Sequence, residues 1–338
     1  IGAGDIFRQR HLPNLRQIEG VEVRVVCNRS EASGRRIAGE FGIAEVETDW
    51  RRLLERDDLD AIMIGTWPYR HKEMSVAALD AGKHVFCQAR MAMDLAEARQ
   101  MVQAVEAHPQ LVHMICPPPH RMPWEPYIRH LIDSDQLGQV RSVRVASLSD
   151  ANLKPGVSWR ERVEYSGKQV LAVGIWAETL NAWLGEYDTL AATTATPIPA
   201  KTDDRGQPYA IRIPQIVLIQ GTLRSGAAIS EHHSGVAGHE RADQVTIDGS
   251  KGTLRVDIRS SSIWFAPLGR ELRQVDVPAD LKRDWQVERD FIEAVRAARQ
   301  GRSWSVSPDF HEGLRYMKKV EAIHQSAQSG ETVRLDQL

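Results

Sequence analysis

The first third of the chain alternates short apolar runs with segments whose apolar residues recur at helical spacing. The apolar runs have the length of buried strands, and they cover Val21–Cys27, Ala61–Gly65, His84–Cys87 and Val112–Cys116. The helical segments reach Leu15 and then cover Ala32–Phe41, Asp49–Glu55, Glu73–Ala81 and Asp94–Ala107. Such alternation indicates parallel βαβ units. We therefore predict a doubly wound parallel sheet over residues 1–118.

Beyond the proline run at residues 117–119, longer strands follow in which apolar and polar positions alternate. They cover Val140–Ser147, Ile216–Leu223, Ala227–Glu231, Gln244–Ile247 and Gly252–Asp257. Helical spacing covers Trp124–Ser134, Val170–Leu184, Asp284–Gln300 and Asp309–Gln328. Strands with one polar face are typical of antiparallel sheets. We predict an α+β domain with a large, mostly antiparallel open sheet for residues 119–338, with the last helices packing back on the first domain.

The composition narrows the class of protein. Of 338 residues, 42% are hydrophobic and 26% charged, with a net charge of −2, as expected of a globular domain pair. No basic stripe favours nucleic acid, and no apolar run is long enough to span a membrane. Cys27, Cys87 and Cys116 lack metal-site spacing, so we expect buried free thiols in a reducing compartment such as the cytoplasm.

Gly2 and Gly4 open a Gly-x-Gly loop ahead of the first helical segment. The first glycine permits a tight turn, and the second lets backbone amides approach a pyrophosphate at the helix start, where Asp5 and Ile6 lie. The third glycine position of the pattern falls on Phe7, a departure. The loop predicts a Rossmann-type dinucleotide site, and an ordinary turn is the alternative. Because a strand normally precedes such a loop, we expect the natural chain to begin before Ile1.

The residues after the second expected strand bear on the choice of cofactor. An acidic residue there would bind the adenosine ribose of NAD, but the chain reads Asn28-Arg29-Ser30. A guanidinium and a hydroxyl group suit the extra phosphate of NADP. We therefore predict NADP in preference to NAD. The alternative is a solvated turn in which Arg29 contacts no ligand.

Several segments together resemble the Gfo/Idh/MocA oxidoreductases over nearly the whole chain. They are TWPYRH (66–71), AALDAGKHVFCQARMAMDLAEARQMV (77–102), the pair Trp159-Arg160, SGKQVLAVGIWAETL (166–180), DGSKGTLRVD (248–257) and HEGLRYMKKVEAIHQSAQSGETVRL (311–335). The resemblance implies a Rossmann domain followed by an open α+β domain. It also implies hydride transfer between NAD(P) and a sugar, cyclitol or similar alcohol. Homodimers or homotetramers that pair the open sheets are implied as well.

The chain departs from this family at the positions that usually transfer protons. The family's Glu-Lys-Pro falls on Gln88-Ala89-Arg90, and its Asp-x-Gly-x-His falls on residues 172–176. The lysine, aspartate and histidine are therefore replaced by Ala89, Ala172 and Trp176. None of these side chains can exchange a proton with a hydroxyl group. The usual mechanism cannot run on the usual residues.

Other residues are candidates for the missing roles. His71, His120 and Lys168 are possible acids or bases, with helix capping, a structural hinge and a solvated loop lysine as the respective alternatives. We interpret Thr66, Trp67, His71 and Gln88 as further cofactor contacts. The expected substrate contacts are Arg90, His120, Arg121, Trp159, Trp176 and His232, although a buried tryptophan is more often a core residue. Glu178 is interpreted as a helix-surface charge.

A metal site is not expected. His232 and His233 are adjacent on a strand and point to opposite faces, so they cannot both ligate one ion. Three functions remain open. The first is an NAD(P)-dependent oxidoreductase of small hydroxy or carbonyl compounds with a non-standard catalytic site. The second is a redox-assisted lyase or glycosidase that recycles its cofactor. The third is a non-catalytic protein that senses the dinucleotide.

Overall fold

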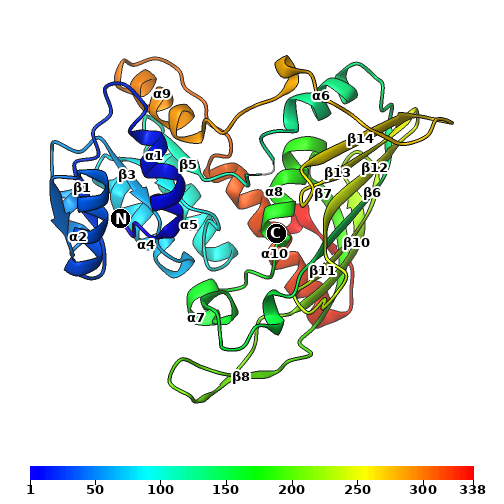
Figure 1. Cartoon of the computed structure of the whole chain (residues 1–338), viewed down its shortest axis with the longest axis horizontal. Helices are drawn as coiled ribbons and strands as arrows, with labels where there is room; N and C mark the ends of the chain where they lie inside the picture. Colours follow the sequence, from blue (N-terminus) through cyan, green and yellow to red (C-terminus); the bar gives the residue numbers. More distant parts are fainter. Residues whose placement is uncertain (120) are drawn as a thin grey trace. The chain divides into compact units, whose positions relative to one another are not determined.

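The structure, a computed structural model, describes residues 1–119 and 121–338 (Figure 1). The chain divides into two compact units. The first unit contains Ile1–Pro117 together with Gln286–Leu314, and the second contains Pro118–Trp285 and Arg315–Leu338. The break after residue 117 lies one residue before the expected domain boundary. The first unit is completed by a late segment of the chain, because that segment contains the helix Val287–Arg299, which packs on the helix Leu12–Leu15.

The first unit has two small parallel sheets with helices around them. One sheet pairs β1 (Val25–Cys27) with β2 (Glu45–Glu47), and the other has the order β3 (Ala61–Ile64), β4 (His84–Cys87), β5 (His113–Ile115). The helices are η1 (Phe7–His11), α1 (Leu12–Leu15), α2 (Glu31–Phe41), α3 (Arg51–Leu54), η2 (Pro68–Arg70), α4 (His71–Asp80), α5 (Leu95–Ala107) and α9 (Val287–Arg299). This arrangement confirms the predicted Rossmann-like parallel architecture.

Local sequence explains where several of these helices begin and end. Ser30 precedes α2, and its hydroxyl group accepts a hydrogen bond from the amide of Ser33. Gly42 ends the same helix in the left-handed conformation, at φ 63°. Asp94 caps α5 by accepting from the amide of Glu97 at 2.9 Å. Such caps satisfy backbone groups that a helix leaves unpaired at its ends.

Ile1 and Gly2 lie between the two parallel sheets and connect them. The Ile1 amino group donates to the Met63 carbonyl at 2.7 Å, and the Gly2 amide donates to the Cys27 carbonyl at 2.7 Å. Beside them is a cavity of about 260 Å³. Its lining includes Val21, Val23, Ala61, Met63, Phe291 and Val295. The predicted strand Val21–Cys27 is therefore shorter in the structure, where its first four residues border this cavity.

The second unit is built on a nine-stranded sheet (Figure 1). Its order is β15-β14-β13-β12-β6-β11-β10-β7-β16, and all neighbouring pairs among the described strands are antiparallel except β6 with β11. The strands are β6 (Val140–Leu148), β7 (Tyr187–Ala195), β10 (Ile216–Leu223), β11 (Ala228–Ser234), β12 (Ala242–Gly249), β13 (Gly252–Asp257), β14 (Ser262–Pro267), β15 (Arg273–Gln274) and β16 (Val333–Arg334). A separate hairpin pairs β8 (Ala200–Thr202) with β9 (Pro208–Ala210). The large, mostly antiparallel sheet that the sequence predicts is confirmed.

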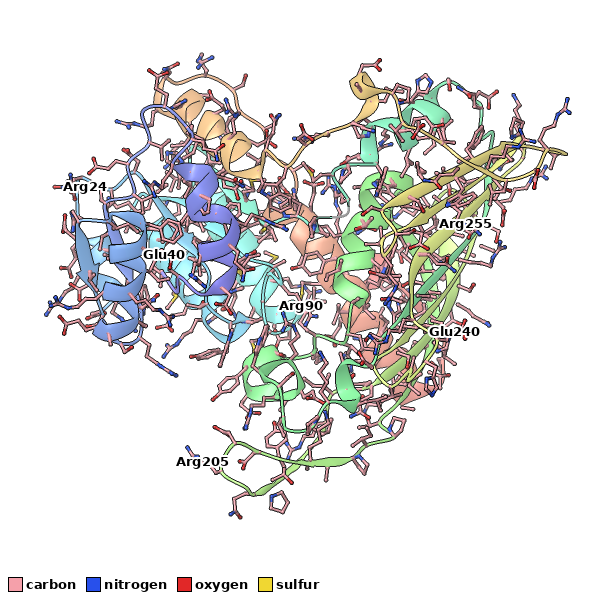
Figure 2. The ribbon with its side chains drawn as sticks, in the orientation of Figure 1. Arg24, Glu40, Arg90, Arg205, Glu240 and Arg255 are labelled. Atoms are coloured by element: carbon pink, nitrogen blue, oxygen red, sulfur yellow. The ribbon has the colours of Figure 1, made fainter. Side chains whose placement is uncertain are left out.

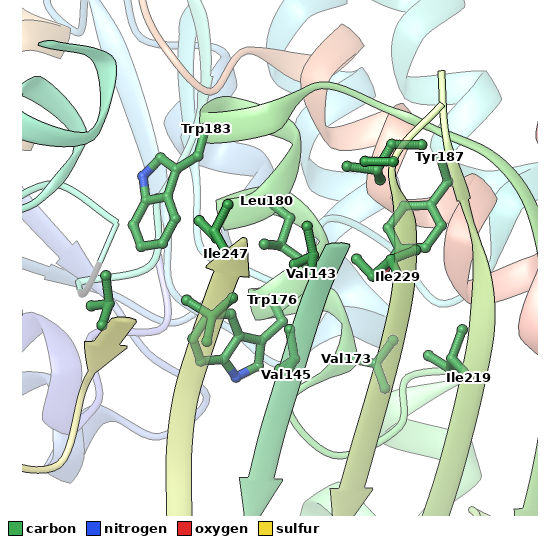
Figure 3. Packing of buried hydrophobic residues seen from close by; sticks show 14 of the residues in the cluster. Val143, Val145, Val173, Trp176, Leu180, Trp183, Tyr187, Ile219, Ile229 and Ile247 are labelled. Atoms are coloured by element: carbon green, nitrogen blue, oxygen red, sulfur yellow. The ribbon is translucent and has the colours of Figure 1, made fainter. Parts of the chain in front are cut away.

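Helices cover one face of this sheet. They are α6 (Glu125–Asp133), α8 (Val173–Leu184) and α10 (Phe310–Ser329), and α10 begins in the first unit. The shorter helices are η3 (Ala151–Leu153), η4 (Trp159–Glu161), α7 (Val163–Ser166), η5 (Ala279–Leu281) and η6 (Leu335–Gln337). Trp176, Leu180 and Trp183 project from α8 onto the strands, where they meet residues such as Val145 and Ile247 (Figure 3). We call this covered side of the sheet its inner face.

Differences from the predicted elements have local causes. The predicted set omits β2, a three-residue strand of sequence EVE with no fully buried residue. It also omits β7, whose burial pattern does not alternate cleanly. Where burial on both faces varies along a strand, the period-2 signal disappears. The helix expected from Val170 begins at Val173, after the separate short helix α7.

Two expectations from composition can be compared with the structure. Cys27, Cys87 and Cys116 are buried and free, as predicted. Burial raises the pKa of the Cys87 thiol to about 12, so this residue is an apolar packing element. In residues 1–119 and 121–338, no helix combines the length and apolar character needed to cross a bilayer.

Candidate functional site

The glycine loop has the geometry of a phosphate cradle. Gly2 has φ +69°, and a Cβ atom there would lie 2.7 Å from the Thr66 side chain, so only glycine fits. The Gly4 amide donates to the Gly2 carbonyl at 2.8 Å and closes the turn. By contrast, a Cβ atom on Gly4 would meet nothing nearer than 3.9 Å. Open space therefore lies beside Gly4 at a helix start, where the exposed Asp5 and Ile6 follow, and a pyrophosphate fits such a place.

Phe7, the departure from the third glycine, is accommodated by a glycine elsewhere. The ring is buried, and a Cβ atom on Gly65 would lie 2.4 Å from its Cε2 atom. The third glycine of the motif allows close packing of helix on strand. Here the small residue stands at the end of β3 and the large one on the helix. The helix and the strand therefore still approach each other closely, although the small and the large residue have changed places.

Asn28 binds the loop rather than standing free at the ribose position. The Ala3 amide donates to Asn28 Oδ1 at 2.8 Å, and Asn28 Nδ2 donates to the Ala3 carbonyl at 3.4 Å. Arg29 is exposed and has no ion-pair partner among the described residues. Ser30 caps α2, and Glu31 pairs with Arg35 on the same helix at 2.5 Å. The exposed guanidinium of Arg29 is therefore the free charge at the end of β1.

His71 is enclosed by backbone. Its Nδ1 atom lies 2.7 Å from the Arg90 carbonyl oxygen, its Nε2 atom lies 2.8 Å from the Thr66 carbonyl oxygen, and the side chain is fully buried. Burial lowers the pKa of the ring, against the opposing effect of these carbonyls. No ring nitrogen is left for a substrate proton in this arrangement. The expected catalytic role is replaced by a positioning role, because His71 ties the loop after β3 to the loop after β4.

Gln88 belongs to a buried relay of hydrogen bonds within the first unit. Its Nε2 atom lies 3.0 Å from His11 Nε2, and its Oε1 atom accepts from the Ala89 amide at 3.2 Å. His11 Nδ1 lies 2.5 Å from Glu288 on α9, and Asn14 also donates to that carboxylate. Both His11 and Glu288 are almost completely buried. Gln88 therefore holds its own loop in place, while a direct contact with the cofactor stays a prediction.

The remaining expected residues of the first unit lie in the loops after β3 and β4. Trp67 is 38% exposed and directly precedes η2. Arg90 is half-buried in the loop that follows β4, and Figure 2 labels it there. The carboxyl ends of parallel strands are where α/β sheets bind ligands. Thr66, Trp67 and Arg90 therefore occupy the edge of β3 and β4 that such a site would use.

In the second unit, the position of the family's histidine belongs to the core. Trp176 is fully buried on α8, and its Nε1 donates to Asp243 Oδ1 at 2.9 Å. Ala172 directly precedes this helix and packs against the same core. Figure 3 shows the Trp176 ring lying over the sheet. Its expected contact with a substrate stays a prediction, and its observed partners are core residues.

Three further expectations change in the structure. Lys168 is 44% exposed and pairs with Glu321 at 2.7 Å, so it is not the desolvated lysine considered as an acid or base. Arg121 is buried and binds Glu125 at 3.1 Å and Glu178 at 3.3 Å. Glu178 is therefore a buried partner of Arg121 rather than a helix-surface charge. The local sequence does not indicate the pair Arg121–Glu178, because these two residues are 57 positions apart in the chain.

The two adjacent histidines occupy opposite faces of the sheet, as their spacing requires. His232 is exposed on the outer face. His233 is fully buried on the inner face, where its Nε2 lies 2.7 Å from Glu231 Oε2. The substrate contact expected of His232 stays a prediction.

Two other expected residues complete the comparison. Trp159 is partly buried, and the Arg160 guanidinium lies 4.4 Å from its ring centroid. His120, expected as a catalytic and substrate-binding residue, lies outside the described residues. Across the rest of the chain there is no cluster of three or more His, Cys, Asp or Glu side chains suited to a metal ion.

Comparison with known proteins places these features in a family. A model of the oxidoreductase family with an NAD-binding Rossmann fold (GFO_IDH_MocA) matches residues 1–115. A model of the GFO/IDH/MocA C-terminal domain matches residues 127–255. The two matches together cover most of the chain. The chain therefore belongs to the Gfo/Idh/MocA oxidoreductase family.

Individual relatives are more distant. The chain is 26% identical over 207 residues to a levoglucosan dehydrogenase of Pseudarthrobacter phenanthrenivorans, an alignment that covers 60% of this chain and 50% of that protein. The chain thus spans about half the length of this relative. It is also 25% identical to a D-apiose dehydrogenase of Paraburkholderia graminis, over 100% of this chain and 89% of that protein.

Solved structures show the same fold. A levoglucosan dehydrogenase in complex with NADH superposes with a TM-score of 0.87 at 22% sequence identity, covering 99% of this chain and 97% of the other. An oxidoreductase domain protein from Kribbella flavida gives a TM-score of 0.84 at 23% identity, covering 97% and 96%. At these identities the likeness establishes the fold alone.

The close packing of the Phe7 ring against Gly65 gives a testable prediction. Gly65→Ala places a methyl group against the Phe7 ring, and we expect it to lower the free energy of unfolding by about 1–3 kcal/mol. The same substitution in a Phe7→Ala background should cost much less, because the clash is gone. Urea unfolding measures both effects.

Gly39→Ala is the matched control for this experiment. Gly39 lies in α2 with nothing within 4 Å of its would-be Cβ atom, so alanine there should stabilise the helix by about 0.5–1 kcal/mol. Equal costs of Gly65→Ala with and without Phe7 would show that the ring does not determine the need for glycine at position 65.

Proposed function

We propose that this protein is an NAD(P)-dependent oxidoreductase of a sugar, a cyclitol or a related small hydroxy or carbonyl compound, with a non-standard catalytic site. The observation that carries the proposal is the glycine loop, which Asn28 holds at Ala3 and which leaves open space beside Gly4. Family membership supports it. The names of two relatives, levoglucosan dehydrogenase and D-apiose dehydrogenase, support a polyhydroxylated substrate.

The chain's own residues have separable tasks in this proposal. The amides at the helix start after Gly4 would bind the pyrophosphate, and Arg29 with Ser30 would bind the additional phosphate of NADP. The bound dinucleotide supplies the hydride chemistry. His71 and Gln88 hold the loops after β3 and β4 in place through their bonds to Thr66, Arg90 and His11. Arg90 would orient an anionic group of the substrate.

Proton transfer must use residues other than those of related enzymes, because Ala89, Ala172 and Trp176 cannot perform it. Of the expected acids and bases, His120 remains proposed for this role. The triple replacement also favours a second candidate, a protein that binds the dinucleotide without net turnover. We further propose that the protein works in a reducing compartment such as the cytoplasm, which the three free buried thiols support.

The first prediction concerns the cofactor. The protein should bind NADPH more tightly than NADH, and Arg29→Ala should weaken NADPH binding about tenfold, because one charge-assisted contact to phosphate is lost. NADH affinity should stay unchanged. Energy transfer from the tryptophans to the bound nicotinamide measures both affinities.

Arg35→Ala is the matched control, because Arg35 lies on the same helix turn but is engaged with Glu31. Equal affinity of the unaltered protein for NADH and NADPH would contradict the NADP preference. Failure to bind either nucleotide would contradict the proposed function as a whole.

The second prediction concerns turnover. With NADP⁺, a panel of aldoses, anhydrosugars and cyclitols should contain a compound whose oxidation raises the nicotinamide absorbance in step with the product. Product without any net absorbance change would instead indicate a recycled cofactor. Tight nucleotide binding without any product would indicate the sensing protein.

We also propose assembly into a homodimer or homotetramer through the open sheet. Leu218 is 45% exposed on the outer face of β10, and its register partner on β11 is the exposed His232. An exposed leucine on a nine-stranded sheet suits an interface between copies. Leu218→Arg should shift the solution mass toward the monomer without altering nucleotide affinity. Arg205→Ala, in the turn of the separate β8–β9 hairpin, is the control (Figure 2). A monomeric unaltered protein would contradict the assembly.

A further inference from the structure

The cavity of the first unit lies between the facing edges of its two parallel sheets. Among the described residues, β1 pairs only with β2, and β3 pairs only with β4, so each of these strands has one edge without a neighbouring strand. The cavity of about 260 Å³ takes its lining from both sides. The lining includes Val21, Val23 and Val25 on the β1 side and Leu59, Ala61 and Met63 on the β3 side. We call this space the slot.

Ile1 and Gly2 bond to both edges of the slot in the pattern of a parallel strand. The Ile1 nitrogen donates to the Met63 carbonyl at 2.7 Å, and the Ile1 carbonyl accepts from the Gly65 amide at 2.8 Å. The next residue bonds to the other side, because the Gly2 amide donates to the Cys27 carbonyl at 2.7 Å. Successive residues of a central parallel strand bond alternately to its two neighbours. Ile1 and Gly2 thus have the bonding of the last two residues of a strand between β1 and β3.

Backbone amides of β1 and β3 are directed into the slot. The Asn28 amide donates to the last residue of β2, and the Ile64 carbonyl accepts from the residue after β4, so these two residues turn away from the slot. Because alternate residues of a strand bond to opposite sides, the amides of their neighbours Cys27 and Met63 turn toward it. Amides inside a fold are normally paired. A strand in the slot would supply acceptors for both.

The side chains around the slot are apolar along its length and charged at one end. Two helices contribute apolar cover, with Leu12 and Leu15 from α1 and Phe291 and Val295 from α9. The charged end lies where β1 and β3 approach their first residues, and it includes Glu22, Arg24, Asp58, Asp60, Arg296 and Arg299. Parallel strands buried on both faces are apolar along their length. The slot therefore suits an apolar strand that begins with a polar residue at the charged end.

The Ile1 nitrogen suits a peptide bond better than an amino group. A protonated amino group has three N–H donors and a full charge. Its protein acceptor among residues 1–119 and 121–338 is the Met63 carbonyl. Burial lowers the pKa of this amino group, because a charge is poorly solvated beside the apolar lining of the slot. A peptide N–H carries no charge and needs one acceptor, which Met63 supplies.

We propose that the slot is the site of a further β-strand, an apolar segment of this protein that leads directly into Ile1. The strand runs parallel to β1 and β3 and joins the two small sheets into one, in the order β2-β1-strand-β3-β4-β5. It is about five residues long, or roughly 16 Å, which reaches the charged end of the slot. It ends at the turn of Gly2 and so anchors the glycine loop between β1 and β3. Its place also explains why residues 21–24 border a cavity instead of extending β1.

Amide hydrogen exchange, followed by NMR, tests the proposal on the full chain with and without the strand. An extension Lys-Val-Ala-Val-Val joined to the Ile1 nitrogen supplies a polar first residue and four apolar ones. We expect it to slow the exchange of the Cys27 and Met63 amides about a hundredfold, because both gain a backbone acceptor. The Asn28 and Gln88 amides already have acceptors, so their exchange should slow by less than about tenfold.

The matched control carries proline directly before Ile1, as Lys-Val-Ala-Val-Pro. It has the same length and charge, but proline cannot donate to β1 and does not fit a central strand. It should leave the exchange of the Cys27 and Met63 amides close to that of the 338-residue chain. Equal protection by both extensions, or protection by neither, would overturn the proposal. Protection that appears in the 338-residue chain as its concentration rises would assign the slot to a second copy and also overturn it.

A smaller change covers the case in which the extended chains do not fold. Acetylation of the Ile1 nitrogen replaces the charged group by an amide and places a methyl group in the slot. We expect the acetylated chain to unfold at a higher urea concentration than the chain with a free amino group. An unchanged or lower midpoint would overturn the proposal. Neither measurement uses a nucleotide, so their outcomes are separate from that of the proposed oxidoreductase function.

Discussion

The nucleotide-binding unit depends on one steric constraint, the close approach of the glycine loop to the end of β3. Gly2 sits against Thr66, and Phe7 sits against Gly65, at separations that leave no room for a Cβ atom on either glycine. Both contacts hold the helix start at the carboxyl edge of the parallel strands. This placement allows the hydrogen bond from the Ala3 amide to Asn28. It also leaves Arg29 exposed and keeps open space beside Gly4. In this chain, Gly65 at the end of β3 makes room for the Phe7 ring that stands at the third glycine position.

The sequence predicted the architecture well because its strongest signals are local. The runs Ala61–Gly65 and His84–Cys87 are mostly apolar and flanked by helical periodicity, and they form β3 and β4. The same reasoning missed β2, whose residues are all half-buried, and β7, whose buried and exposed residues do not alternate. It also predicted that both late helices pack on the first domain, whereas α9 belongs to the first unit and most of α10 to the second. Which unit a helix joins depends on tertiary contacts such as α1 with α9, which periodicity does not encode.

The site was harder to predict, because side-chain partners lie far apart along the chain. The expected roles of His71 and Lys168 ignored Thr66 and Glu321, which engage them in the structure. The adjacent histidines were correctly placed on opposite faces, but only the paired strands show which face the helices cover. Lys319 carried no signal at all, since a lysine in an amphipathic helix is normally solvated. Burial with a carboxylate 88 residues away can be seen only in three dimensions.

The relay from Gln88 through His11 to Glu288 has a consequence for how the protein is made. Glu288 and α9 belong to the first unit, although 277 residues separate His11 from its carboxylate partner. On the ribosome, residues 1–117 emerge early but lack the helix that satisfies His11. The nucleotide-binding unit can be completed only after nearly the whole chain has been synthesised. Until then, the half-built unit lacks α9 and leaves uncovered the apolar side chains that Phe291 packs on, such as Phe86, which makes it a natural client for chaperones during translation.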